Sequence, residues 1–289
     1  MSSSSRFVYL LTSIPLFVFL NLARVLPFRA RVKLGGLLFG FAARVVSPVR
    51  ARILENVKLA RPEMADADAR RFCSAVGTQI GRTLTEILFG EEHQKKHLPF
   101  AVSGPGLAAI EAAQEAGQPI LLISAHFGQW DAARIHLRDK MGLEVGALFR
   151  PLNNPYLNGV WKRGISASGE PLIPKGREGL RDLLAQLRAG KPMAILADQY
   201  QMNGVMLPFL GHDAMTALAA AELALKFDAV LVPVFCIRAD ADNRVEVTFH
   251  APLPHTTPEE MMRAFNECAS AQIGAHPDQW LWPHRRWKT

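Results

Sequence analysis

The first 52 residues of the chain contain no aspartate and no glutamate. The same stretch carries eight basic side chains, whereas the rest of the chain is close to electrically neutral, so the net charge of +7 comes almost entirely from the N-terminal part. A basic protein is often a nucleic-acid-binding protein. Here the basic residues are interleaved with long uncharged runs, which favours an anionic membrane surface instead, and we expect no nucleic-acid partner.

Cysteine is also scarce, with three residues in the whole chain: Cys73, Cys236 and Cys268. They are widely spaced and form no C-x-x-C pair, so the sequence predicts neither a disulfide framework nor a zinc site, and we expect a reducing compartment. The chain has no G-x-S-x-G nucleophile elbow, and no cysteine lies close in sequence to His126. A covalent acyl-enzyme route therefore lacks its usual sequence signature.

The uncharged run at residues 7–23 is 17 residues long and contains Pro15. This length is at the lower edge of the roughly 17 to 25 apolar residues that span a bilayer. We predict an N-terminal membrane-anchor helix within a basic, amphipathic segment of residues 1–46. The alternatives are an interfacial helix in the headgroup plane and a cleaved signal peptide. Because the basic residues follow the run, the positive-inside rule places the rest of the chain in the cytoplasm.

Residues 47–289 have the pattern of one α/β domain. Residues 47–92 are helical in pattern, with breaks near Pro62 and Gly90, and a Pro/Gly-rich connection follows. Farther along, short apolar runs alternate with amphipathic stretches, which favours a mostly parallel central sheet flanked by helices. The expected strands are 119–124, 144–149, 170–174, 193–197, 229–237 and 244–250. The expected helices are 129–140, 154–166, 177–189, 213–227 and 258–275.

Polar side chains follow five of the expected strands. In an open α/β sheet, ligand-binding residues collect beyond the carboxyl ends of the strands. The residues at these positions are His126, Arg150, Lys175, Asp198 with Gln199, and Arg238. Each of them alone is as easily a solvated loop residue. Together they place one base, one acid and three cations at one edge, which suits an anionic substrate such as a phosphorylated lipid or a carrier-borne thioester.

His126 and Asp131 are five residues apart in the stretch "SAHFGQWDAARIHL". On a continuous helix they would lie about 140 degrees apart, on different faces. A strand that ends near Ala125, a turn through Gly128 and a helix that begins near Gln129 would instead bring the carboxylate back toward the imidazole. Such a pair is a general base and the group that orients it. The alternative is a turn histidine beside an ordinary helix-start aspartate.

The motif H-x-x-x-x-D in "HFGQWD" resembles that of the glycerolipid acyltransferase superfamily. The whole chain is similar to the lipid A biosynthesis acyltransferases, the lauroyl and myristoyl transferases. The matching blocks are "ENVKLARPEM", "FRPLNNPYLN", "LADQY", "LPFLGHDAMTALAAAELALKFDAVLVPVF" and "HPDQWLWPHRRWK". This resemblance implies an acyltransferase of the bacterial inner membrane that has its catalytic domain on the cytoplasmic face and needs no metal or cofactor.

The resemblance also implies roles for individual residues. His126 would be the general base and Asp131 its acidic partner, at a position where the lipid A branch commonly has glutamate. Arg150 and Asp198 fall on motif positions that would line the site, and Lys175 is a looser match. The implied reaction moves an acyl chain from the thioester of acyl carrier protein to a hydroxyl of a lipid A precursor. Arg150 is the first choice for binding the oxyanion that forms.

Some alternatives stay open. The same chemistry suits a lysophospholipid, an amino-acid-derived lipid or another glycolipid as acceptor, and a membrane-associated binding protein without turnover is a further possibility. Two sets of cations are candidates for steering an acidic carrier protein toward the site: those between Arg24 and Arg52, and Arg285, Arg286 and Lys288. The C-terminal block "QWLWPHRRWK" suits either a membrane interface or a segment packed on the sheet.

Overall fold

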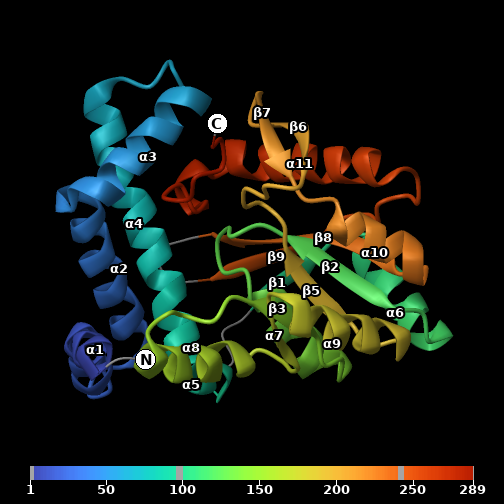
Figure 1. Ribbon diagram of the computed structural model, residues 1–289, viewed down its shortest axis with the longest axis horizontal. Coiled ribbons are helices and arrows are strands. Elements are labelled where there is room, and N and C mark those ends of the chain that lie inside the picture. Colours follow the sequence, from blue (N-terminus) through green and yellow to red (C-terminus); the bar gives the residue numbers. More distant parts are fainter. Residues whose placement is uncertain (1–2, 96–99, 240–243, 289) are drawn as a thin grey trace.

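A seven-stranded sheet forms the centre of the computed structural model, which describes residues 3–95, 100–239 and 244–288 (Figure 1). Across the sheet the strands are β1 (Phe100–Ser103), β9 (Val245–Phe249), β8 (Val230–Arg238), β2 (Ile120–Ser124), β5 (Met193–Leu196), β3 (Gly146–Phe149) and β4 (Leu172–Pro174). The strands from β8 to β4 are all parallel, whereas β9 runs antiparallel to β8 and parallel to β1. The predicted α/β class with a mostly parallel sheet is therefore confirmed.

Helices cover both faces of this sheet. One face carries α6 (Gly106–Ala116), α7 (Ala132–Met141) and α8 (Pro155–Ser166), and the other carries α9 (Arg177–Arg188), α10 (Ala219–Phe227) and α11 (Pro258–Ala275). All five residues of β2 are buried. Leu121 and Ile123 pack against the face that carries α9, α10 and α11, whereas Leu122 packs against the face that carries α6 and α7. This two-sided burial is the reason that the strands are continuous apolar runs in the sequence.

A two-stranded hairpin, β6 (Val205–Phe209) and β7 (His212–Thr216), stands apart from the main sheet. The helix predicted over residues 213–227 is thus wrong in its first part, since α10 begins only at Ala219. Leu210 and Gly211 both have positive φ, 50° and 80°, and form the kind of two-residue turn that closes hairpins. β1 and α6 were also not predicted, because β1 lies within residues 93–106, which we interpreted as a Pro/Gly-rich connection, and α6 begins where that stretch ends.

The N-terminal part of the chain is helical. It comprises α1 (Ser3–Ala23), α2 (Phe28–Val45), α3 (Ser47–Ala60), α4 (Asp66–Leu88) and α5 (Gly90–Lys95). Glycines let α2 and α4 touch backbone to backbone: a Cβ on Gly81 would lie 2.4 Å from the carbonyl oxygen of Gly35. Figure 1 shows α2 and α4 side by side next to the sheet. Residues 28–45 therefore share an interface with the helices that follow, and the domain boundary after residue 46 stays a prediction.

The predicted membrane-spanning anchor is not confirmed. In the parts of the chain that the structure describes, no single helix combines the length and the apolar character needed to cross a membrane. The apolar part of α1, Phe7–Ala23, is shorter, and the pair α2 and α3 passes on length and composition but is bent by 81°. Both α1 and α2 expose large apolar side chains, which are Phe7, Val8, Leu10, Leu11, Ile14, Val18, Leu22, Leu37, Leu38, Phe39, Phe41 and Val45.

Candidate functional site

His126 lies in the turn between β2 and α7. β2 ends at Ser124, and Gly128 has a φ of 55°, a conformation that favours glycine. A Cβ on Gly128 would also lie 1.8 Å from the carbonyl oxygen of Cys236, so no side chain fits there. The predicted strand, break and helix are therefore confirmed, with α7 beginning at Ala132 rather than near Gln129.

The His126 imidazole is bound by Asp198, which follows the neighbouring strand β5. Nδ1 of His126 lies 2.8 Å from Oδ1 of Asp198. The other carboxylate oxygen accepts hydrogen bonds from the His126 backbone N–H at 3.0 Å and from Nε1 of Trp280 at 2.8 Å. Burial opposes ionisation of Asp198, but the His126 imidazole and these hydrogen bonds outweigh it and hold the pKa of the carboxyl well below its usual range.

This arrangement fixes the tautomer of His126. An ionised carboxylate only accepts hydrogen bonds, so Nδ1 of the neutral imidazole must carry the proton. The second ring nitrogen, Nε2, then has a free lone pair, and none of the described residues forms a hydrogen bond with it. The side chain of His126 is 19% exposed and lines a cavity, so Nε2 is placed to accept a proton from a bound molecule.

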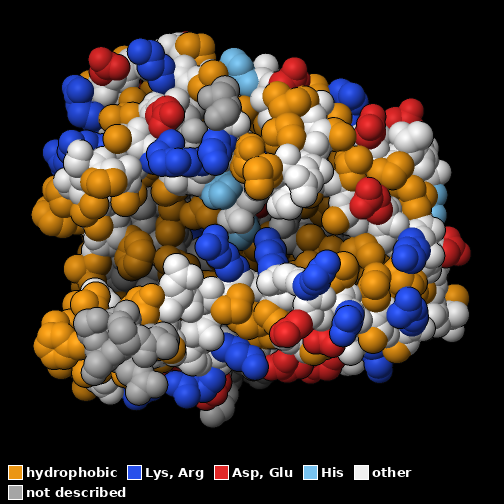
Figure 2. Space-filling view, viewed as in Figure 1, with side chains coloured by type: hydrophobic (Ala, Val, Ile, Leu, Met, Phe, Trp, Pro, Cys, Tyr) orange, Lys and Arg blue, Asp and Glu red, His pale blue; other side chains and the backbone are white. Residues whose placement is uncertain are grey.

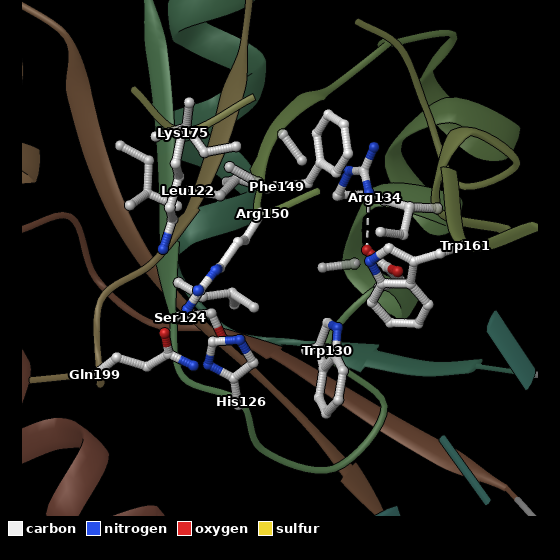
Figure 3. Close-up of a pocket in the computed structure, with 18 of the residues that line it drawn as sticks. Leu122, Ser124, His126, Trp130, Arg134, Phe149, Arg150, Trp161, Lys175 and Gln199 are labelled. Atoms are coloured by element: carbon white, nitrogen blue, oxygen red, sulfur yellow. Dashed lines mark hydrogen bonds and ion pairs between the residues drawn. The ribbon is translucent and has the colours of Figure 1, made fainter. Parts of the chain in front are cut away.

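Asp131 does not make the contact with His126 that we predicted. Its Oδ1 accepts a hydrogen bond from Nη1 of Arg134 at 2.8 Å, the ion pair drawn as a dashed line in Figure 3. Its Oδ2 is buried and has no hydrogen-bond partner among the described residues. Arg134 lies three residues farther along the chain, within reach of a carboxylate at the helix start. The acid that contacts the imidazole is instead Asp198, 72 residues away in sequence.

A cavity of about 440 Å³ opens beside His126, between the sheet and helices α7 and α8. Figure 3 shows the polar ends of Arg150, Lys175 and Gln199 turned toward His126, as the strand-end rule predicted for these residues. Away from them most of the wall is apolar and includes Leu122, Ala147, Phe149, Trp130, Trp161, Ile165, Ala194 and Val234, and the ion pair of Asp131 and Arg134 also lies on it. The cavity therefore joins a charged entrance to a mostly apolar interior.

Lys175 and Arg150 are close enough to influence each other. Partial burial lowers the pKa of Lys175, and the neighbouring Arg150 lowers it further, while Asp198 acts in the opposite direction. Arg150 is an exposed residue on the loop that follows β3. Both cations lie on the cavity wall with His126, so an anionic group bound there would be held next to the imidazole.

Arg238 is not part of this cavity, contrary to the prediction. β8 continues through Arg238, and its guanidinium forms two hydrogen bonds of 2.8 Å with Glu86 of α4. A third, of 3.2 Å, reaches Oγ1 of Thr83. Both partners of the ion pair are buried, with side-chain exposures of 1% and 0%. Arg238 does lie at the end of a strand, as predicted, but its guanidinium forms an ion pair with the buried carboxylate of Glu86.

The C-terminal segment, residues 277–288, contributes residues that the sequence did not identify as functional. Trp280 is fully buried, and its indole N–H binds Asp198. The backbone N–H of Leu281 donates to the carbonyl oxygen of His126 at 3.1 Å, and the carbonyl of Gln279 accepts from Gly128 at 2.9 Å. Of the two interpretations of this block, the structure shows the packed one.

His284 also belongs to the cavity wall. Its Nε2 accepts the backbone N–H of Tyr200 at 3.2 Å, and its backbone carbonyl accepts from Nδ2 of Asn56 at 2.7 Å. Arg286, two residues later, is fully buried and donates to Oγ1 of Thr216 at 2.8 Å, whereas Arg285 and Lys288 are exposed. The cations of this block thus divide into one that holds the segment in place and two that face solvent.

The described residues contain no group of three or more histidine, cysteine, aspartate or glutamate side chains arranged to hold a metal ion. The three cysteines are unpaired in the structure. What the site offers chemically is therefore an oriented imidazole, nearby cations and an apolar cavity.

Comparison with known proteins gives consistent results. The family described as bacterial lipid A biosynthesis acyltransferase matches residues 3–289. The lipid A biosynthesis acyltransferase of Haemophilus influenzae is 24% identical over 267 residues, covering 91% of this chain and 83% of the relative. The lipid A biosynthesis lauroyltransferase of Escherichia coli is 26% identical over 274 residues, covering 91% and 87%. The lipid A biosynthesis palmitoleoyltransferase of Escherichia coli is 28% identical over 193 residues, covering 64% and 60%.

Proposed function

Because this chain belongs to the bacterial lipid A biosynthesis acyltransferases, we propose that it moves a fatty acyl chain from the thioester of acyl carrier protein to a hydroxyl of a lipid A precursor. The observation that carries the proposal is the hydrogen bond between Nδ1 of His126 and Asp198, which leaves Nε2 free at the wall of the cavity. That geometry is the one a general base needs.

The proposed reaction proceeds by direct attack. Nε2 of His126 takes the proton from the acceptor hydroxyl as its oxygen attacks the thioester carbonyl. The tetrahedral intermediate then expels the thiolate, which recovers the proton from the imidazolium. The negative charge of Asp198 stabilises that imidazolium and holds the ring in one orientation, as in other base and carboxylate pairs. General-base help of this kind is worth about 100-fold to 10,000-fold in rate.

The rest of the cavity suits the two substrates. The apolar interior fits a hydrocarbon chain, since burying each methylene group is favourable by about 0.8 kcal/mol. Arg150, Lys175 and Gln199 at the entrance suit phosphate groups of the acceptor, and Arg150 suits the oxyanion that forms during attack. An acidic carrier protein would meet the exposed Arg285 and Lys288 of the C-terminal segment, whereas the buried Arg286 is not available to it.

The acceptor has a second candidate, a different hydroxyl-bearing lipid such as a lysophospholipid, an amino-acid-derived lipid or another glycolipid. Asp131 is the feature that favours it, because this position commonly holds glutamate in the lipid A branch. In this chain Asp131 binds Arg134 at the cavity wall and not the imidazole. The departure would therefore affect the shape of the cavity and with it the choice of acceptor, while the base keeps its partner.

The N-terminal helices support a location at the bacterial inner membrane, and the proposal places the catalytic domain on its cytoplasmic face. Figure 2 shows apolar side chains along the edge of the molecule that α1 and α2 form, with lysines and arginines nearby. Such a surface suits the acyl-chain boundary of an anionic bilayer, with α1 and α2 either lying in the interface or inserting more deeply. Asn154, at the start of α8, donates a hydrogen bond to the carbonyl of Tyr9 at 2.8 Å, which ties α1 to the cavity side of the domain.

A reconstituted assay tests the proposal. Purified chain is mixed with acyl carrier protein that bears an acyl thioester and with a lipid A precursor that has a free hydroxyl. Thiol release is followed over time, and the mass of the lipid product is measured by mass spectrometry. We expect thiol release that depends on the acceptor and a lipid heavier by one acyl group. Lysophospholipid and ornithine-type lipid in place of the precursor decide between the acceptors, and absence of thiol release with all of them would contradict the acyltransferase proposal.

A further inference from the structure

A second histidine, His284, lines the same cavity as His126 but differs from it in its hydrogen bonds. The Nε2 atom of His284 lies 3.2 Å from the backbone nitrogen of Tyr200. A backbone N–H can only donate, so this ring nitrogen must present a lone pair. The imidazole of His284 is then neutral, with its hydrogen on Nδ1, and no described residue accepts that hydrogen.

We propose that the Nδ1 hydrogen of His284 is donated to the carbonyl oxygen of the thioester, where negative charge collects as the acceptor hydroxyl attacks. This role rests on the proposed function, because it assigns a group to the same reaction. In that reaction His126 removes the proton of the acceptor hydroxyl, whereas His284 keeps its own proton and donates a hydrogen bond to the carbonyl oxygen. No sequence feature singled out His284 for this role.

The surroundings of His284 keep it neutral. Burial is the main reason that its pKa is lowered, and Arg286, Lys175 and the imidazolium that forms at His126 act in the same direction, against the opposing effect of Asp198. A protonated ring would also have no lone pair for the Tyr200 N–H. A neutral imidazole can donate a hydrogen bond to a developing oxyanion, and because it holds its proton more tightly than imidazolium does, it keeps that proton during the reaction.

His284 is also held rigidly. Its backbone carbonyl accepts a hydrogen bond from Asn56, its backbone N–H donates to the carbonyl of Leu281, and the buried Arg286 fixes the chain two residues later. Preorganised donors stabilise an oxyanion more than mobile ones, since they need no rearrangement during the reaction. Arg150 is the alternative donor, but it is an exposed residue, so water screens its charge.

The bonds and charges of the step balance. The C–O bond forms while the hydroxyl proton moves to Nε2 of His126, and the carbonyl electron pair moves onto the oxygen that His284 binds. The carbonyl then forms again, the C–S bond breaks, and the leaving thiolate takes the proton from His126. His284 neither gains nor loses a proton, and no further reactant is needed.

Two isosteric substitutions separate the two nitrogens of His284. In His284→Asn the amide nitrogen falls close to the position of Nδ1 and keeps a donor there. In His284→Gln the amide oxygen falls close to the position of Nε2, keeps the acceptor for the Tyr200 N–H and loses the donor. Kcat, KM for the acyl donor and the pH profile are measured for the wild-type chain and both variants, with melting temperatures as a check on the fold.

We expect His284→Gln to lower kcat about 100-fold or more with little change in KM, the loss typical of one missing oxyanion donor. His284→Asn should retain at least about tenfold more kcat than His284→Gln, and the pH dependence of kcat should keep its wild-type shape because neither variant changes His126 or Asp198. Equal losses in the two variants, or a His284→Gln variant with wild-type kcat, would overturn the role of His284 while an active wild-type chain keeps the acyltransferase proposal. A wild-type chain that releases no thiol would overturn both.

Discussion

Two buried aspartates lie near His126, one on the loop after β5 and one at the start of α7, and their partners differ. Asp198 binds the imidazole, the His126 backbone and Trp280, whereas Asp131 binds Arg134 and leaves its second oxygen without a partner. Asp131 is nearer in sequence, and Asp198 is nearer in space. The comparison teaches that the role of a buried carboxylate follows from the group that it contacts and not from the motif that contains it.

Removing the base should have the largest effect. His126→Ala takes away the proton acceptor that Asp198 orients, so we expect kcat to fall about 100-fold to 10,000-fold. Thiol release from the acyl carrier protein measures this, and a melting temperature close to that of the wild-type chain shows that the fold is intact. Wild-type turnover in this variant would contradict the role of His126 as the base, and the contact of Asp198 with His126 would then have no catalytic meaning.

Asp198→Asn should come next. The amide keeps the shape of the side chain but loses the charge that stabilises the His126 imidazolium and fixes the tautomer. We expect kcat to fall about 100-fold or more, with KM for the acyl donor close to its wild-type value. If this variant kept kcat within threefold of the wild-type value, Asp198 would be only a structural residue.

Asp131→Asn should lower the stability of the fold strongly and kcat only weakly. The substitution leaves the buried Arg134 without its ion-pair partner, and we expect the free energy of unfolding to fall by about 3 kcal/mol. Because Asp131 makes no hydrogen bond to the imidazole, kcat at a temperature where the variant is folded should fall less than tenfold. Denaturant unfolding and initial rates measure the two quantities, and Asp131→Glu, which keeps the charge, serves as the matched control with the mildest loss. A kcat loss as large as that of Asp198→Asn would return Asp131 to the role that we predicted from the sequence.

The smallest effect concerns acid stability. The pKa of Asp198 is lowered in the folded chain, so its charged form stabilises the fold above the ordinary aspartate pKa of about 4, and that contribution is lost as the pH falls below this value. Chemical unfolding between pH 3 and pH 6 should therefore show a steeper loss of stability at low pH for the wild-type chain than for Asp198→Asn. Parallel curves for the two proteins would contradict the lowered pKa.

Much of the fold was predictable because buried parallel strands are apolar runs and the helices between them are amphipathic. The hairpin β6 and β7 was not, since "DAMTALAAAELALKF" has a helical composition and only the turn at Leu210 and Gly211 reveals the reversal. In the site, the strand-end rule correctly grouped His126, Arg150, Lys175, Asp198 and Gln199.

The pairing within the site was not predictable from patterns of this kind. Asp198 contacts His126 because β5 lies next to β2, and strand order is a property of the whole sheet. Arg238 was misplaced for the same reason, since Glu86 comes from a distant helix. A local signal for Asp131 did exist, because Arg134 follows it at helical spacing. The contributions of Trp280 and His284 depend on where the C-terminal segment packs.

The most direct test of the account is a nuclear magnetic resonance measurement of the His126 ring in a chain with isotope-labelled histidine, with His126→Ala used to assign its signals. We predict a proton on Nδ1 and a strongly hydrogen-bonded Nδ1–H signal that persists in Asp131→Asn and disappears in Asp198→Asn. A signal that disappears in Asp131→Asn and persists in Asp198→Asn would contradict the pairing of His126 with Asp198.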